Sequence, residues 1–97
     1  MRRHEVLTLL EANRQAICER FGVSSLRVFG SVARDEAAEG SDIDILVGFA
    51  DSPTFRTYMD LRIFLEDLLQ AKVDLITETG LKERARPFVE KDAIRVS

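Results

Sequence analysis

Hydrophobic residues along the chain fall into two spacings, one typical of helices and the other typical of strands. Between residues 3 and 21 they recur at close to helical spacing, and Gly22 follows as a natural end to a helix. Residues 55–70 repeat the helical pattern, with Pro53 or Thr54 placed to begin it. We therefore expect one helix over 3–21 and a second over 55–70.

Three shorter segments have the composition of strands. They are "SLRVF", which ends at Gly30-Ser31, "DIDILVGF" over 42–49, and "KVDLIT" over 72–77. Residues 32–38 suit one or two helical turns with Ser31 near the N-cap position. In the tail, Pro87 should interrupt any helix, and 93–97 suits a short edge strand. This order predicts an α/β domain in which a small mixed β-sheet is flanked by helices.

Composition and charge narrow the class of protein. The chain has 97 residues, of which 45% are hydrophobic and 32% charged, so we expect a single domain over 1–97. No apolar run approaches the roughly 20 residues that span a bilayer, and the N-terminus lacks a secretory hydrophobic region, so we expect a cytoplasmic protein with no membrane partner. The net charge of −3 argues against a nucleic-acid partner. With one histidine and one cysteine, any chemistry should depend on carboxylates and hydroxyls.

Five polar or small residues interrupt the hydrophobic segments, and each alone has an ordinary structural explanation. Gly30 could be a turn residue, and Ser31 could cap a helix. Asp42 could cap a turn, whereas Asp44 and Asp74 could face water on a half-exposed sheet. Aspartate is nonetheless disfavoured in strands, and a buried charge is costly unless it is paired or bound to a metal.

Taken together, the same residues indicate a site for a metal and a phosphate. If the three strands are neighbours, Asp42, Asp44 and Asp74 can project from one face of the sheet. Clustered carboxylates repel unless a cation is present, and Mg²⁺ is usually held by one or two carboxylates together with substrate phosphates. Asp42 and Asp44 can reach one ion and Asp74 a second. Gly30 would let the backbone approach a phosphate, to which Ser31 could donate a hydrogen bond.

The spacing of these residues resembles a known signature. Gly30-Ser31, ten residues and then Asp-Ile-Asp is similar to the DNA polymerase beta-like nucleotidyltransferase superfamily. "FGSVAR…SDIDILVGF" most resembles its minimal nucleotidyltransferase (MNT) branch, which includes the antitoxins paired with HEPN toxins. "KVDLIT" matches the place of that family's third carboxylate. The resemblance covers residues 20–77 closely, and it implies the nucleotidyltransferase fold and Mg²⁺-dependent transfer of AMP from ATP to a hydroxyl.

The resemblance also implies roles for individual residues. Gly30 and Ser31 would bind the triphosphate, and Asp42 and Asp44 would ligate two Mg²⁺ ions. Asp74 would complete the metal site or accept the proton of the attacking hydroxyl.

The chain departs from the family pattern at two positions. Many relatives read Gly-Ser-Arg-Ala-Arg-Gly, whereas here Val32 replaces the first arginine and Asp35 the final glycine. Arg34 is kept, so it would either contact a phosphate or lie on a solvated helix face. The three aspartates are intact, which favours a competent enzyme.

The small size of the chain bears on the acceptor. Little room is left for a second substrate-binding domain, so the acceptor should belong to another polypeptide, and the antitoxin branch implies a tyrosine of a partner HEPN toxin. Two alternatives remain, a non-catalytic antitoxin that acts by binding alone and nucleotidyl transfer to a small molecule such as an aminoglycoside. The helix over 55–70 has surplus apolar residues that either contact a partner or are covered by the tail, namely Phe55, Met59, Ile63 and Phe64.

Overall fold

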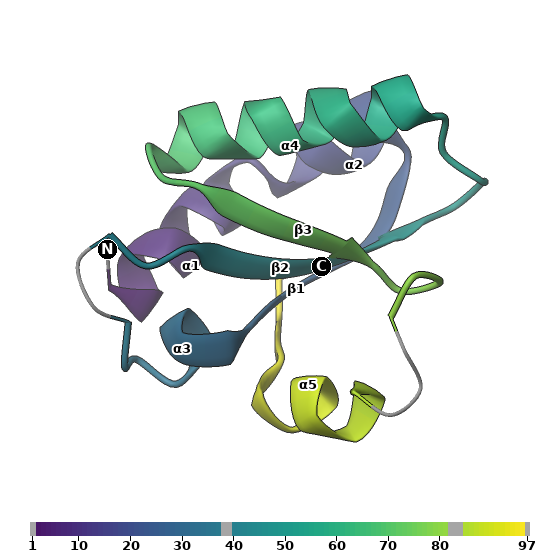
Figure 1. Cartoon of the computed structure of the whole chain (residues 1–97). Helices are drawn as coiled ribbons and strands as arrows, with labels where there is room; N and C mark the ends of the chain where they lie inside the picture. Colours follow the sequence, from purple (N-terminus) through teal and green to yellow (C-terminus); the bar gives the residue numbers. More distant parts are fainter. Residues whose placement is uncertain (1, 38–39, 82–84, 97) are drawn as a thin grey trace.

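One four-stranded mixed sheet organises the chain. The computed structural model describes residues 2–37, 40–81 and 85–96 (Figure 1). The strands are β1 (Val23–Phe29), β2 (Ile43–Phe49), β3 (Val73–Thr77) and β4 (Ile94–Arg95), in the order β3-β2-β1-β4. β1 is antiparallel to β2 and β4, whereas β2 and β3 are parallel. The predicted mixed sheet is therefore confirmed, and the three strands that carry candidate residues are neighbours.

The helices divide between the two faces of this sheet. α1 (Arg3–Ala12), α2 (Arg14–Phe21) and α4 (Phe55–Leu69) lie on one side, and α3 (Gly30–Ala33) and α5 (Arg86–Asp92) lie on the other (Figure 1). The main core forms where alternate strand residues meet the first group of helices. Its fully buried members include Leu10, Ile17, Ile43, Ile45, Leu61 and Leu65. Alternation along β2 therefore turns Asp44 toward the side of α3 and α5.

The prediction of a single helix over 3–21 is wrong at one residue. Asn13 leaves the helical conformation, with φ −110° and ψ 7°, and separates α1 from α2. Its side-chain amide donates to the Leu9 carbonyl at 2.8 Å, which is how asparagine competes with the helical backbone. Gly22 ends α2 with φ 68°, as expected.

The prediction that Pro87 interrupts the tail is also wrong. Pro87 lies in the first turn of α5, where backbone N–H groups have no acceptor within the helix. The absence of an N–H in proline therefore costs no hydrogen bond, and Pro87 helps to start the helix instead of breaking it. The expected short strand follows as β4, at the edge of the sheet. The tail does not cover α4, because Phe55 and Ile63 remain 79% and 58% exposed.

Side chains of α4 cap the outer edge of β3 and so fix the strand that carries Asp74. The Tyr58 hydroxyl donates to the Leu75 carbonyl, and the Glu66 carboxylate accepts from the Val73 N–H at 3.0 Å. An uncapped edge strand would offer these groups to another chain. The capping therefore holds Asp74 beside β2 and discourages strand addition at this edge.

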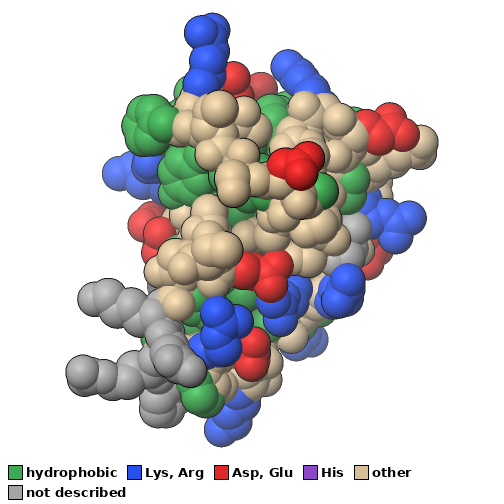
Figure 2. All heavy atoms as spheres, turned by 90° about the vertical axis from the view of Figure 1, so that its right-hand side faces the viewer, with side chains coloured by type: hydrophobic (Ala, Val, Ile, Leu, Met, Phe, Trp, Pro, Cys, Tyr) green, Lys and Arg blue, Asp and Glu red, His purple; other side chains and the backbone are tan. Residues whose placement is uncertain are grey.

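The end of the molecule remote from α3 has a mixed surface. Figure 2 shows acidic and basic side chains side by side there, with hydrophobic side chains toward α4 at the top. Within the described ranges, no helix is long and apolar enough to cross a membrane.

Candidate active site

Strand pairing brings the candidate residues together at one end of the sheet. Phe29, the last residue of β1, is in register with Asp44 of β2, and Asp44 is in register with Asp74 of β3. Paired residues of adjacent strands share a face of the sheet and lie about 5 Å apart. Gly30 follows Phe29 directly, so segments that are far apart in the sequence meet beside α3 (Figure 1).

Gly30 and Asp44 fit closely against each other. Gly30 has φ +73°, in the left-handed region that side chains disfavour. A Cβ at this position would lie 2.2 Å from Asp44 Oδ2 and 3.1 Å from its Cγ. Any other residue here would strain the backbone and would displace the Asp44 carboxylate, so glycine allows that carboxylate to lie against the turn.

The three aspartates form a cluster of negative charge. Asp44 is half-buried, whereas Asp42 and Asp74 are exposed. Burial, the nearby charges of Asp74 and Asp42, and a hydrogen bond with Asp74 raise the pKa of Asp44 to about 6. In the described part of the chain, no lysine, arginine or histidine forms an ion pair with any of the three. The cluster thus has the electrostatic character of a cation site.

The donor set fits Mg²⁺ better than a self-contained metal centre. No group of three His, Cys, Asp or Glu side chains among the described residues is arranged to hold a metal ion. Mg²⁺ prefers oxygen donors and usually takes one or two carboxylates, with the remaining positions filled by water and substrate phosphates. Asp42 and Asp44 can supply such carboxylates. Neither forms an ion pair in the described part of the chain, and this unpaired negative charge supports a bound cation.

Ser31 lies inside the first turn of α3. This helix begins at Gly30 with Phe29 as its N-cap, so Ser31 lies near the N-cap, as expected, but its side chain does not cap the helix. The Ser31 carbonyl accepts from the Glu36 N–H at 2.8 Å. Its hydroxyl has no hydrogen-bond partner among the described residues, which leaves it free to donate to a ligand.

Arg34 is held by two carboxylates. Its Nη1 donates to Asp92 Oδ2 at 2.7 Å and its Nε to Glu36 Oε2 at 3.1 Å, which raises the pKa of the guanidinium. The positive charge of Arg34 lowers the pKa of Asp44, against the larger effects of burial and of Asp74 and Asp42, which raise it. Asp92 could not be identified from the sequence, because the helix that carries it was not expected.

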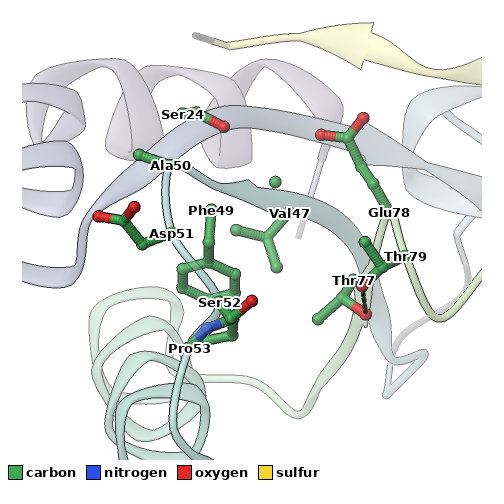
Figure 3. A pocket seen from close by; sticks show the side chains of 11 residues that line it. Ser24, Val47, Phe49, Ala50, Asp51, Ser52, Pro53, Thr77, Glu78 and Thr79 are labelled. Atoms are coloured by element: carbon green, nitrogen blue, oxygen red, sulfur yellow. Dashed lines mark hydrogen bonds between the residues drawn. The ribbon is translucent and has the colours of Figure 1, made fainter.

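Two hollows flank opposite ends of the sheet. The first, of about 460 Å³, borders Asp42 and lies between the segment that precedes β2 and the turn that precedes β3. The second, of about 350 Å³, lies where β2 and β3 end, and Figure 3 shows Phe49, Ser52 and Thr77 around it. None of the predicted site residues lines the second hollow. Of the predicted site residues, which all lie in the described part of the chain, Asp42 alone lines the first hollow, so the register of the strands and not either hollow locates the candidate active site.

Comparisons with known proteins agree with this geometry. Residues 10–96 match the family described as nucleotidyltransferase domain. The chain is 39% identical over 92 residues to the protein adenylyltransferase MntA of Thermococcus cleftensis, covering 95% of this chain and 93% of that protein.

Solved structures share the architecture. A candidate minimal nucleotidyltransferase is 45% identical, with a TM-score of 0.75 and coverage of 91% of this chain and 93% of the other. A chain from the complex of a tri-AMPylated Shewanella oneidensis HEPN toxin with its MNT antitoxin is 20% identical, with a TM-score of 0.69 and coverage of 94% and 71%. The second likeness concerns the fold alone. Together they confirm the fold class expected from the sequence.

Proposed function

This chain belongs to the nucleotidyltransferase domain family, and from this premise we propose that it transfers AMP from ATP to a tyrosine hydroxyl of a partner HEPN-type toxin. The observation that carries the proposal is the convergence of Gly30, Asp44 and Asp74 at one end of the sheet. A relative named protein adenylyltransferase supports a protein as acceptor. The AMPylated HEPN toxin in the complex of similar fold supports a toxin as that protein.

The reaction exchanges one phosphorus–oxygen bond for another. The tyrosine oxygen forms a bond to the α-phosphorus of ATP, the bond from that phosphorus to the oxygen bridging to the β-phosphate breaks, and pyrophosphate leaves. Such in-line transfer depends on positioning and charge stabilisation rather than on a covalent enzyme intermediate. We assign the hydroxyl proton to Asp74, which is exposed and therefore open to an acceptor that arrives from solution.

The remaining site residues bind the nucleotide. Gly30 lets the backbone approach a phosphate, and the unpartnered hydroxyl of Ser31 donates to it. Arg34, at the end of the same turn, contributes positive charge. Asp42 and Asp44 would hold Mg²⁺, which when bound neutralises phosphate charge and lowers the pKa of the attacking hydroxyl.

The acceptor has to reach the side of the sheet that carries Asp44. The helix α4, which carries the exposed residues Phe55 and Ile63, lies on the opposite side of the sheet (Figure 1). They remain a predicted partner contact, but a tyrosine bound directly on them would face away from Asp74. A toxin that contacts α4 must therefore also extend around the sheet to deliver its hydroxyl.

Position-specific labelling tests the transfer. The chain is incubated with Mg²⁺, the toxin and ATP labelled at either the α- or the γ-phosphate. We expect the α-label on the toxin and the γ-label in pyrophosphate. Asp44→Asn should abolish toxin labelling, whereas Asp51→Asn, the same change at an exposed aspartate of the opposite hollow, should not.

The two alternatives give different results in the same assay. A toxin that is neutralised without carrying label identifies a binding antitoxin and contradicts the proposal. Label that appears on an added aminoglycoside, with none on the toxin, identifies a small-molecule acceptor instead.

A further inference from the structure

Arg34 joins the turn beside Asp44 to the tail helix α5. Its backbone N–H donates to the Gly30 carbonyl at 3.2 Å, which fixes its main chain to the turn that contacts Asp44. Its side chain reaches Asp92, the last residue of α5, at 2.7 Å. The Asp92 side chain is 24% exposed, whereas that of Glu36, the second partner, is 66% exposed. Asp92 is thus the closer and better shielded of the two contacts.

Asp92 occupies a position that its own helix disfavours. The C-terminal end of a helix carries partial negative charge, so an acidic residue there is unfavourable unless something else compensates. The other end of α5 is fixed independently, because Arg86 Nη2 donates to the Glu78 carbonyl just beyond β3 at 3.1 Å. Lys91 places one positive charge in the last turn of α5, and the ion pair with Arg34 at 2.7 Å adds a second that contacts the Asp92 carboxylate directly.

The two ion pairs leave part of the guanidinium available. Arginine has five N–H donors in a planar arrangement that suits phosphate oxygens. Nε contacts Glu36 and Nη1 contacts Asp92, whereas Nη2 has no hydrogen-bond partner among the described residues. An arginine that is already fixed in place loses less side-chain entropy when it binds an anion than a free one does.

We propose that Asp92 is a positioning residue for nucleotide binding, which holds the Arg34 guanidinium so that its remaining donors meet the triphosphate. The inference rests on the proposed function, because it takes Gly30 and Ser31 as the place where the triphosphate binds. It extends the site to α5, a helix that lies on the same side of the sheet as α3 (Figure 1).

Binding affinities of single and double variants test this role. Dissociation constants for ATP with Mg²⁺, for inorganic triphosphate and for adenosine are measured by calorimetry on the full chain. Arg34→Gln should weaken binding of ATP and triphosphate by about tenfold or more, because it removes a charge-assisted contact. Asp92→Asn should weaken both by roughly threefold to tenfold, because Arg34 is then no longer fixed. Adenosine binding should be unchanged in both variants.

Coupling between the two residues separates positioning from a merely structural effect. The double variant should bind ATP no more weakly than Arg34→Gln alone, since Asp92 acts through Arg34. Asp92→Glu, which keeps the charge, should recover part of the affinity, and Glu36→Gln should have little effect because its ion pair is exposed. At saturating ATP, Asp92→Asn should retain the kcat of the wild type.

Several outcomes would overturn the inference. Unchanged ATP affinity in Asp92→Asn would leave Asp92 a structural partner, and tighter binding would make it a competitor of the phosphates. Additive losses in the double variant would show that Asp92 acts independently of Arg34. If the variants show the expected coupling in ATP affinity but the wild type transfers no AMP, the inference is supported and the proposed function is defeated, so the two failures are distinguishable.

Discussion

Replacing Gly30 by alanine tests whether the turn after β1 and the Asp44 carboxylate are built to fit each other. The new Cβ would lie 2.2 Å from Asp44 Oδ2, and real Cβ contacts essentially never fall below 3.0 Å. The oxygen must therefore move by about 1 Å, from 2.2 Å to beyond 3.0 Å. A displacement of this size at a reacting group can reduce the rate by about 100-fold, which is the loss of kcat/KM that we expect.

Gly22 provides a matched control for the backbone effect. It has φ +68°, close to the +73° of Gly30, but an added Cβ there meets nothing within 4 Å. Alanine in the left-handed region costs about 1–2 kcal/mol, so both variants should lose roughly that much free energy of unfolding. Only Gly30→Ala should also lose AMP transfer.

Urea unfolding measures the loss of stability, and transfer of label from α-labelled ATP to the toxin measures the loss of activity. Both are measured on the same preparations. Activity of Gly30→Ala within a few-fold of wild type would refute the argument that the glycine places Asp44. An equal loss of activity in Gly22→Ala would attribute the effect to general destabilisation.

Three further predictions concern charge, backbone strain and metal binding. In metal-free protein, the pKa of Asp44 lies above its unfolded value, so its favourable contribution to stability is complete below about pH 4 and is lost as the pH rises through about 6. A shift from 3.8 to about 6 corresponds to about 3 kcal/mol, which partial exposure and screening reduce to about 1 kcal/mol, so Asp44→Asn should stabilise the metal-free protein by that amount above pH 6 in urea unfolding. Asp35 has φ 58°, in the left-handed region, so Asp35→Gly should be more stable in urea unfolding than Asp35→Ala by about 1–2 kcal/mol, because both variants lose the hydrogen bond that the Asp35 carboxylate accepts from the Arg3 N–H; equal stabilities would count against backbone strain there. ATP with Mg²⁺ should raise the melting temperature of the wild type and not of the double variant Asp42→Asn with Asp44→Asn, and EDTA should remove the increase.

Local sequence pattern predicted most of the architecture because each main element has its own signal. The alternation along residues 42–49 predicted β2 and the face of the sheet on which Asp44 lies. The stripe of apolar residues along 55–70 predicted α4. The break at Asn13 escaped detection because the hydrophobic spacing continues through it. Pro87 indicates a break in a helix, but proline is equally compatible with the first turn of a helix, which is where the structure has it.

The site was predictable as a set of residue types but not as a set of contacts. The spacing from Gly30-Ser31 to Asp42 and Asp44 identified the chemistry, whereas the closeness of Gly30 to Asp44 follows from the register of β1 with β2. The Arg34–Asp92 pair joins residues 58 positions apart, through a helix whose presence the sequence left open. Such long-range contacts depend on how elements pack, which no local pattern specifies.

The intact mass of the partner toxin tests directly whether this protein transfers AMP to it. The toxin is co-expressed with the wild type, with Asp44→Asn or with the control Asp51→Asn, purified and measured by mass spectrometry with fragmentation. We expect at least one adenylyl group on a tyrosine of toxin co-expressed with the wild type or Asp51→Asn, and none with Asp44→Asn. Toxin that carries no adenylyl group, yet is neutralised equally by all three versions, would contradict enzymatic transfer and leave an antitoxin that acts by binding.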